Sequence, residues 1–303
     1  MKWIQVFFAQ LWGAFRATLK TFIAENYLRL SASLSYYTIF SLAPLLIITI
    51  SLFGYFFGRQ AMEGRIFSEI RTHVGDVAAL QIQQMIQQVV LTQDSFVARI
   101  AGFIVMVLGI TAVFTEVQDA INNIWKLKPI PKLNRKKYLI KRVISLGLFS
   151  IIGFILVLSL IINLLINIFG NYLEFFAGAG LYMVFVINRI FIIAIVATLF
   201  TFMLKYLPDG KVKWKDAIKG AIFTSIFFML GKTVIGYFLG HFNVTSTYGA
   251  AGSLVILLLW IYYSSVIIYF GATFTKVYAY LYGGKIIPRS FAIFVETNEI
   301  SPN

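Results

Sequence analysis

The stretch "RLSASLSYYTIFSLAPLLIITISLFGYFFG", residues 29–58, decides the fold class, because it is long and apolar enough to cross a bilayer. It nevertheless opens with three serines and two tyrosines and carries a proline. Lipid gives helices no hydrophobic reason to associate, so close packing of small residues and side-chain hydrogen bonds hold a membrane bundle together. We interpret Ser31, Ser35 and Thr38 as one packing face of a first span, with a substrate-lining face as the alternative. Pro44 is expected to bend this helix.

Composition extends this interpretation to the whole chain. The 303 residues are 59% hydrophobic, 17% aromatic and only 13% charged, with a mean hydropathy of +0.83, which lies far outside soluble usage. The fold class predicted is an all-α integral membrane protein with six transmembrane helices, in which residues 1–303 form a single membrane domain. The six spans are expected at Ser35 to Phe57, Val97 to Thr115, Val143 to Phe169, Tyr182 to Leu207, Ala217 to Leu239 and Ser253 to Thr275.

Basic residues predict the orientation of these spans. Lys and Arg crowd the N-terminal stretch and the segments 126–142 and 205–219, whereas segments 170–181 and 240–252 contain neither. Loops rich in Lys and Arg stay in the cytoplasm. Both termini are therefore expected inside, with residues 276–303 as a cytoplasmic tail.

Two further segments have amphipathic helical spacing. Residues 1–28 repeat Trp and Phe at intervals of three and four with Lys and Arg between them, which predicts a helix lying on the inner membrane face. This segment lacks the small-residue cleavage site of a signal peptide. Residues 58–96, between the first two spans, are expected to form an outer loop with two short extracytoplasmic helices.

Three blocks of sequence together carry a family resemblance: "SASLSYYTIFSLAPLL", "YLPDGKVKWKDAIKGAIF" and "YGAAGSLVILLLWIYYSSVIIYFGATFT". They resemble the YihY/BrkB family of bacterial multi-pass membrane proteins, once mislabelled as ribonuclease BN. The resemblance implies a six-span protein of the bacterial inner membrane, in a family proposed to export lipids or envelope components. In this family an acidic residue usually follows the Gly-Ala pair of the last span, but here Thr273 follows Gly271 and Ala272. No role of that carboxylate carries over.

The sequence gives little support for catalysis. We expect that the protein is not an enzyme and binds no metal or cofactor. Metal-dependent phosphodiester hydrolysis needs several His and carboxylate ligands, but the chain has only His73 and His241, both predicted outside. Cysteine and the glycine-rich phosphate loops are absent. Anionic head groups of membrane lipids explain the basic loops better than nucleic acid does. Homo-oligomerisation is left open.

Two cations stand out inside the predicted spans. Arg189 in the fourth span and Lys232 in the fifth each lie about 12 Å from the outer end, at 1.5 Å per residue, and no acidic residue lies at a similar depth. Such cations can bind an anion, although long basic side chains can also reach outward to the head groups. A polar stripe in the third span could line the same path or bond between helices: Ser159, Asn163 and Asn167.

The acidic residue nearest to a span is Glu116, at the cytoplasmic end of the second. We expect it to pair with a cytoplasmic Lys or Arg, with a gate or proton carrier as the alternative. Two functions follow from these patterns. One is export or transport of an anionic lipid or other envelope-related anion through a cavity among spans three to five. The other is a noncatalytic scaffold or assembly partner in envelope maintenance.

The predicted topology can be tested by cysteine labelling, because the chain has no native cysteine. A cysteine at Ala250 should react with an impermeant thiol reagent in intact cells, and one at Asn134 only after permeabilisation. Reaction at position 134 in intact cells would overturn the topology.

Overall fold

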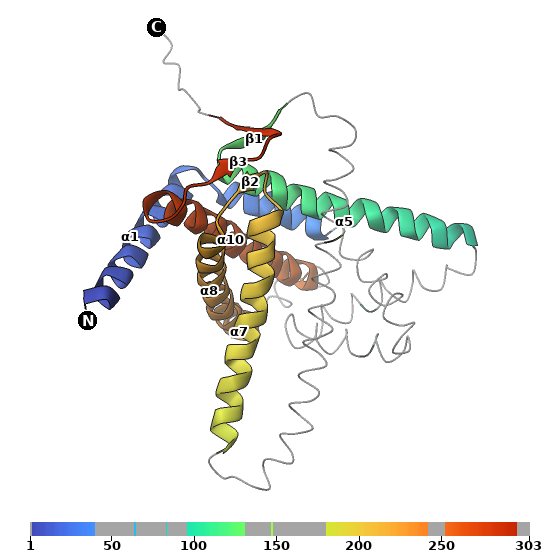
Figure 1. The fold of residues 1–303 in the computed structure, drawn as a ribbon. Coiled ribbons are helices and arrows are strands. Elements are labelled where there is room, and N and C mark those ends of the chain that lie inside the picture. The colour runs from blue at the N-terminus through green and yellow to red at the C-terminus, as the bar shows by residue number, and fades with distance from the viewer. Residues whose placement is uncertain are drawn as a thin grey trace. The chain divides into compact units, whose positions relative to one another are not determined.

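Helices dominate the computed structural model, which describes residues 2–39, 96–130, 180–241 and 252–295 and the single residues Gly64, Gln83 and Gly147. The mostly helical prediction is thereby confirmed. Among these residues, Trp214–Ile235 and Val255–Leu281 are long and apolar enough to cross a membrane, and Ile193–Tyr206 is a shorter apolar helix. Six spans remain a prediction. The helices are α1 (Lys2–Ala24), α5 (Phe96–Ile124), α7 (Gly180–Tyr206), α8 (Trp214–His241) and α10 (Gly252–Leu281) (Figure 1).

Within the described residues four short strands accompany the helices, so this part of the chain is mostly rather than entirely helical. β1 (Leu127–Pro129) pairs antiparallel with β4 (Ala292–Phe294), and β2 (Gly210–Lys211) pairs antiparallel with β3 (Ile287–Pro288). These strands follow directly after α5, α7 and α10, and they lie together in space (Figure 1). Segments of two or three residues are too short to show strand periodicity, so the sequence did not reveal them. The predicted tail thus begins as the last turns of α10 and continues into two strands.

The chain divides into two compact units. Unit 1 contains Met1–Glu25, Gln118–Met229 and Ile268–Asn303, and unit 2 contains Asn26–Val117 and Leu230–Ile267. Unit 1 therefore holds α1, all four strands and the ends of the helices that adjoin them.

The N-terminal helix is shorter than the predicted 1–28. α1 ends at Ala24, and a second helical stretch occupies residues 28–39. Asn26 between them has φ of 53°, a left-handed conformation that asparagine tolerates better than most residues and that commonly ends a helix. The amphipathic pattern ran continuously past this position, so only the backbone conformation reveals the break.

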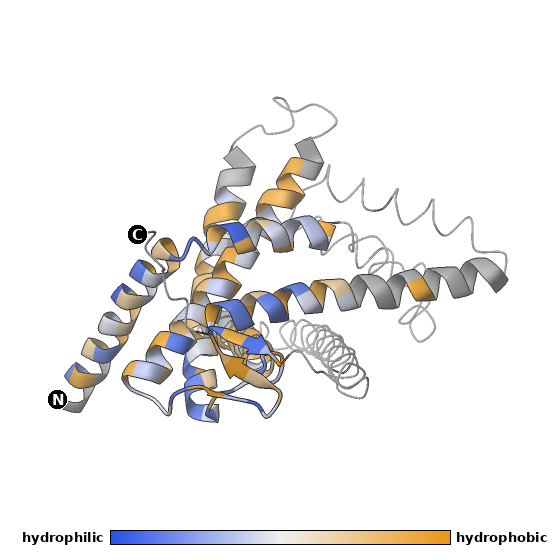
Figure 2. Ribbon diagram, turned by 90° about the horizontal axis from the view of Figure 1, so that it is seen from above, coloured by the Kyte–Doolittle hydropathy of each residue, from blue (hydrophilic) through white to orange (hydrophobic). Residues whose placement is uncertain are grey.

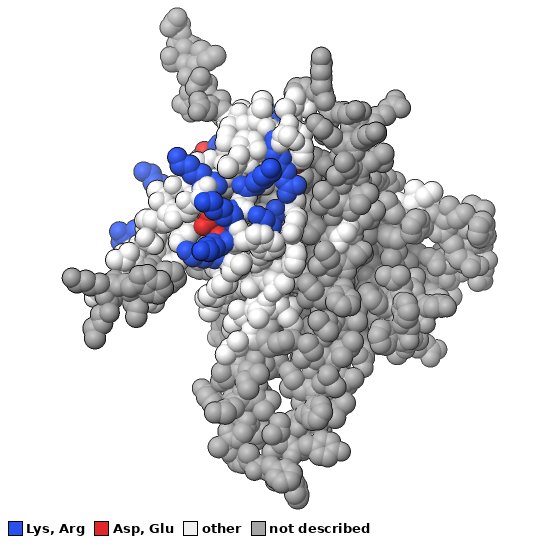
Figure 3. Space-filling model, viewed as in Figure 1, with Lys and Arg blue, Asp and Glu red and all other residues white. Residues whose placement is uncertain are grey.

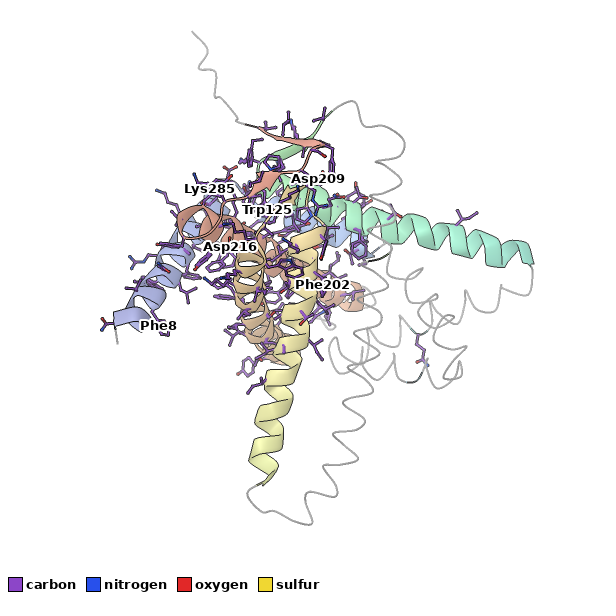
Figure 4. All side chains as sticks on the ribbon, in the orientation of Figure 1. Phe8, Trp125, Phe202, Asp209, Asp216 and Lys285 are labelled. Atoms are coloured by element: carbon purple, nitrogen blue, oxygen red, sulfur yellow. The ribbon has the colours of Figure 1, made fainter. Side chains whose placement is uncertain are left out.

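In unit 1, α1 has one face that packs on other helices and another that exposes large apolar side chains. On one face the ring of Phe15 lies 5.9 Å from that of Phe227 and 6.0 Å from that of Phe270, joining α1 to α8 and α10. On another face Phe8 is 64% exposed and Trp12 56% exposed. Figure 4 shows Phe8 near the end of α1 that bears the N-terminus. The location of α1 at the inner membrane interface stays a prediction.

The helices α8 and α10 pack through a reciprocal pair of Gly and Thr residues. A Cβ on Gly220 would overlap the side chain of Thr275, and a Cβ on Gly271 would overlap that of Thr224. Each glycine lies four residues before a threonine on its own helix, so each helix presents a hollow opposite the other's hydroxyl side chain. Both hydroxyls bond back to their own helix, Thr224 Oγ1 to Gly220 O at 2.7 Å and Thr275 Oγ1 to Gly271 O at 2.8 Å. The crossing is therefore close and leaves no hydroxyl unsatisfied.

The polarity of α8 is the reverse of that of a soluble helix. Ile218, Ile222 and Ile226 are exposed, whereas Thr224 and Ser225 are fully buried. In water this arrangement would be unfavourable, because it exposes apolar side chains to solvent. In lipid it places small and hydroxyl residues between helices and aliphatic residues against acyl chains. Figure 2 shows hydrophobic residues along the helices and more hydrophilic residues toward the strands.

Unit 2 explains the serines of the opening stretch. Ser31 and Ser35 are buried, as expected of a packing face. Their hydroxyls bond to carbonyls one turn earlier in the same helix, Ser31 Oγ to Tyr27 O at 3.3 Å and Ser35 Oγ to Ser31 O at 2.7 Å. They therefore act as small residues with internally satisfied hydroxyls, as Thr224 and Thr275 do in unit 1.

The Gly–Thr crossing predicts a specific pattern of stability. Gly220→Ala should lower the free energy of unfolding by about 1–3 kcal/mol, because the added methyl group overpacks a close contact. Combining it with Thr275→Gly should restore part of that loss. Unfolding in mixed micelles measures both effects.

Gly13→Ala is the matched control for this crossing, since a Cβ there approaches only the hydroxyl end of Tyr282, at 2.9 Å, which can move. Equal destabilisation by Gly13→Ala and Gly220→Ala would contradict the proposed role of the crossing.

Candidate functional site

A buried aspartate organises the polar end of unit 1. Asp209, in the turn between α7 and β2, is only 2% exposed. Its Oδ1 accepts a hydrogen bond from Gln118 Nε2 and its Oδ2 accepts one from Asn122 Nδ2, both at 3.0 Å. The Asp209 backbone N–H donates to Asn122 Oδ1 at 2.8 Å. Two amides one turn apart on α5 therefore hold both carboxylate oxygens, which compensates the cost of burying them.

The same turn fixes the segment after α10. The backbone N–H of Arg289 donates to Asp209 O at 2.9 Å. The Arg289 Nη2 atom donates to Lys205 O and to Tyr206 O, each at 3.3 Å. These carbonyls end α7 and have no partner within the helix, so a guanidinium is a favourable cap for them.

A tryptophan and a lysine connect the end of α5 to α10. Trp125 is fully buried, and its Nε1 donates to Ala272 O at 3.0 Å. Lys276 Nζ donates to Ile124 O, the last residue of α5, at 2.7 Å. Thr273, at the position where the family resemblance implies an acid, is buried and bonds to Tyr269 O at 2.8 Å. At this position the chain has a hydroxyl satisfied within its own helix.

A second buried acid secures the start of α8. Asp216 accepts a hydrogen bond from the backbone N–H of Gly284 at 2.9 Å, which ties the first turn of α8 to the turn after α10. A Cβ on Gly283 would lie 2.6 Å from either carboxylate oxygen, so this close approach requires glycine. Figure 4 labels Asp209, Trp125 and Asp216 in the same region, where the strands meet the helix ends.

Cations cover the outside of this region. Figure 3 shows a cluster of Lys and Arg on the face formed by the ends of α7, α8 and α10 and the strands. We call this surface the cationic rim. The described segments 205–219 and 285–289 contribute the following cations to these helix ends and strands, and we define the rim by them: Lys205, Lys211, Lys213, Lys215, Lys219, Lys285 and Arg289.

Aromatic rings lie beside the cationic rim. Tyr206 and Trp214 are 41% and 46% exposed, and their ring centroids are 6.0 Å apart in a T-shaped arrangement. Lys205 Nζ lies 5.3 Å from the centre of the Trp214 ring. Lys219 Nζ lies 4.6 Å from the ring of Tyr278, which is itself buried, and donates to its hydroxyl at 2.6 Å. Exposed aromatic rings next to lysines are typical of a membrane–water interface.

The two predicted substrate-path cations fall on described helices. Arg189 lies in α7 and Lys232 in α8, but their side chains lie outside the described part of the structure. Ser159, Asn163 and Asn167 also lie outside the described residues. The substrate path among spans three to five therefore stays a prediction.

Glu116 has a partner that sequence reasoning did not anticipate. In unit 2, Ser33 Oγ donates to Glu116 Oε1 at 2.6 Å. A hydroxyl that donates a hydrogen bond to a carboxylate stabilises it, and this stabilisation does not require a basic side chain. The basic partner expected for Glu116 remains a prediction. The ion pair resolved nearby along the chain belongs to unit 1, where Lys126 Nζ lies 2.5 Å from Glu25 Oε2.

Sequence reasoning missed the Asp209 network. Residues 205–219 were interpreted as a basic cytoplasmic loop, yet this loop contains two buried acids, Asp209 and Asp216. The sequence "YLPDG" carried one signal, because a Pro-Asp-Gly sequence predicts a tight turn with a fixed backbone. The amides that bond to Asp209 lie about 90 residues earlier, at sequence separations of 91 and 87, and no local pattern connects them.

The polar groups at this end of unit 1 hold the segments together and give the surface a positive charge. Within the described residues, no group of three or more His, Cys, Asp or Glu is placed to hold a metal ion. Asp209 and Asp216 are already engaged by protein donors. The outward-facing groups are cations and aromatic rings, which bind anions and interfacial lipid groups.

Comparison with known proteins places this fold in a family. The model of the family described as "Virulence factor BrkB" matches residues 18–289. The chain belongs to the BrkB virulence factor family. This confirms the resemblance to the YihY/BrkB family, and the chain is accordingly an integral membrane protein.

Bacterial relatives agree with this assignment. The chain is 27% identical to a UPF0761 membrane protein of Rhodospirillum centenum over 90% of its own length and 59% of that protein. It is 26% identical to one of Stenotrophomonas maltophilia over 84% of its own length and 58% of that protein. A UPF0761 membrane protein of Pseudoalteromonas translucida is 26% identical over 80% of this chain and 78% of that protein. The chain thus spans about three fifths of the first two relatives. No solved structure matches it significantly.

The Asp209 network predicts a large effect of one substitution. Asp209→Ala should lower the free energy of unfolding by about 2–3 kcal/mol, because it leaves the buried amides of Gln118 and Asn122 without an acceptor. Asp209→Asn should cost less, since its carbonyl oxygen still accepts from one amide. Thermal unfolding of the purified protein in detergent ranks the variants.

The control is Lys128→Gln, which changes an exposed residue of β1 and should leave stability unchanged. If Asp209→Ala unfolds at the wild-type temperature, Asp209 does not hold unit 1 together.

Proposed function

We propose that this chain transports or exports an anionic lipid, or another anionic molecule of the cell envelope, across the bacterial inner membrane. In this proposal both termini face the cytoplasm. The substrate path runs among spans three to five, with Arg189 and Lys232 attracting the negative head group and Ser159, Asn163 and Asn167 along its wall. Glu116 is the candidate for a gate at the cytoplasmic end.

The observation that carries the proposal is the cationic rim of unit 1. Residues 205–219 contain five lysines and two aspartates, and both aspartates are buried and bonded inward. The outward charge of this segment is therefore positive, and it adjoins exposed aromatic rings. Each cation near a membrane surface gains about 1 kcal/mol from anionic lipid, so this surface concentrates anionic head groups at the cytoplasmic end of the helices.

A second candidate function is a membrane scaffold that takes no part in transport. The observation that favours it is the set of connections within unit 1: side chains connect α5 to α10 and α8 to the turn after α10, and the strand pairs connect the segments between helices. The exposed apolar face of α1 would then serve as a docking surface for a partner within the membrane. A scaffold needs the cationic rim only for orientation, not for movement of lipid.

Transbilayer movement of labelled lipid in liposomes separates the two functions. Purified protein should speed the exchange of a fluorescent phosphatidylglycerol between leaflets, and Arg189→Gln and Lys232→Gln should each slow this exchange about tenfold or more. Removal of either cation weakens the attraction of the anionic head group within the bilayer. Arg189→Lys should retain part of the activity, because it keeps the charge but loses the planar guanidinium.

Labelled phosphatidylcholine and the Lys128→Gln variant are the controls for this assay. The neutral lipid should move slowly, and Lys128→Gln should behave as the wild type, since it removes an equal charge outside the predicted path. Absence of any exchange by folded wild-type protein, or full exchange by both glutamine variants, would leave the scaffold function ahead.

A further inference from the structure

One row of side chains on α8 changes character along its length. Trp214, Ile218, Ile222 and Ile226 recur every four residues, and each is between 42% and 46% exposed. The row begins beside exposed lysines of residues 211–215 and continues into purely aliphatic surface. The order of charge, aromatic ring and aliphatic chain matches the order of head group, interface and hydrocarbon in one leaflet of a bilayer.

The aromatic end of the row is a built corner of three rings. Phe202 stacks on Tyr206 with centroids 5.9 Å apart, and it meets Trp214 edge-on at 6.3 Å. The Tyr206 and Trp214 rings complete the corner at 6.0 Å. Because these residues come from the end of α7 and the start of α8, the turn organised by Asp209 determines their spacing. The corner is thus preformed rather than assembled on binding.

Two cations are fixed at this corner by their own hydrogen bonds. Lys205 Nζ donates to Val212 O and lies 5.3 Å from the centre of the Trp214 ring. The guanidinium of Arg289 caps α7 beside Lys205, and its Nε is buried without a hydrogen-bond partner in the described structure. Lys211 on β2 is exposed and directly precedes Val212, whose carbonyl accepts from Lys205. The carboxylate oxygens of Asp209 in the same turn accept hydrogen bonds from the amides of α5.

We propose that unit 1 binds one anionic phospholipid at this corner. The phosphate lies at Lys205, Lys211 and Arg289, the glycerol region lies against Tyr206 and Trp214, and an acyl chain follows Ile218, Ile222 and Ile226. The site needs a negative phosphate and an attached acyl chain together, because its charged end and its aliphatic row are continuous. It does not require that the lipid be moved, so it stands whether or not the chain is a transporter.

Native mass spectrometry of the full-length protein in detergent tests the site. Dioleoyl phosphatidylglycerol is added at increasing concentration, and the first bound molecule is counted against dioleoyl phosphatidylcholine. The wild type should bind one phosphatidylglycerol at least fivefold more tightly than phosphatidylcholine. Lys205→Gln should weaken that first binding about fivefold, the loss expected for one interfacial charge. Lys205→Arg should stay within about twofold of the wild type.

Lys128→Gln is the matched control, because it removes an exposed lysine away from the corner. Circular dichroism and the unfolding temperature show whether each variant is folded. If Lys128→Gln and Lys205→Gln weaken binding equally, the lipid responds to diffuse charge and the site is disproved. Equal affinity for the two lipids, or a dimer that forms without lipid and hides the α8 row, also overturns the proposal.

A second measurement follows the acyl chain and distinguishes lipid from free phosphate. Phosphatidylglycerol with brominated acyl chains should quench part of the tryptophan fluorescence, and Trp214→Phe should remove the component that saturates with one lipid per chain. Inorganic phosphate at millimolar concentration should not displace this lipid, since it lacks the chain. Displacement by phosphate, or unchanged saturable quenching in Trp214→Phe, contradicts the proposed binding mode.

Discussion

The buried carboxylate of Asp209 is the interaction on which the described part of unit 1 depends. A carboxylate that is almost completely removed from water is costly unless donors surround it, and the amides of Gln118 and Asn122 supply them from α5. The backbone of the same residue accepts from Arg289, which in turn caps α7. One side chain and its peptide thus relate three segments that are distant in sequence. The strand pairs and the Asp216 contact add to this arrangement around the same turn.

The burial pattern of the helices changes along their length, as expected when one end lies beside water and head groups and the rest lies in lipid. Near the strands, cations face outward and acids face inward, as expected beside water and anionic head groups. Along α8 the exposed residues become aliphatic while Thr224 and Ser225 face inward, as expected in lipid. The reciprocal contacts of Gly220 with Thr275 and of Gly271 with Thr224 then permit a close helix crossing without any hydrophobic drive. Near the strands the exposed residues are charged, whereas a few turns further along α8 the exposed residues are aliphatic and the buried ones carry hydroxyls.

This arrangement has a functional consequence for anionic lipids. Asp209 and Asp216 form their hydrogen bonds toward the interior of unit 1. They therefore do not neutralise the lysines at the outer surface, which stays strongly positive. The ends of α7 and α8 position Lys205 against Trp214, next to the aliphatic row of α8. Membership of the BrkB family places the chain in a membrane, and the geometry of the rim gives head groups a defined place to bind. The proposals of lipid transport and of a resident lipid both start from this surface, but they depend on different residues.

Sequence alone determined the membrane class, the helical content and the family, because these depend on composition, long apolar runs and short motifs. It also indicated the packing role of Ser31 and Ser35, since helical periodicity is local. Tertiary structure decided the rest. The break at Asn26 depends on one left-handed residue, and the strands are too short to have a period. The partners of Asp209, Trp125 and Asp216 lie between 68 and 147 residues away along the chain. Such contacts depend on how helix ends meet in space, and no spacing within a single segment encodes them.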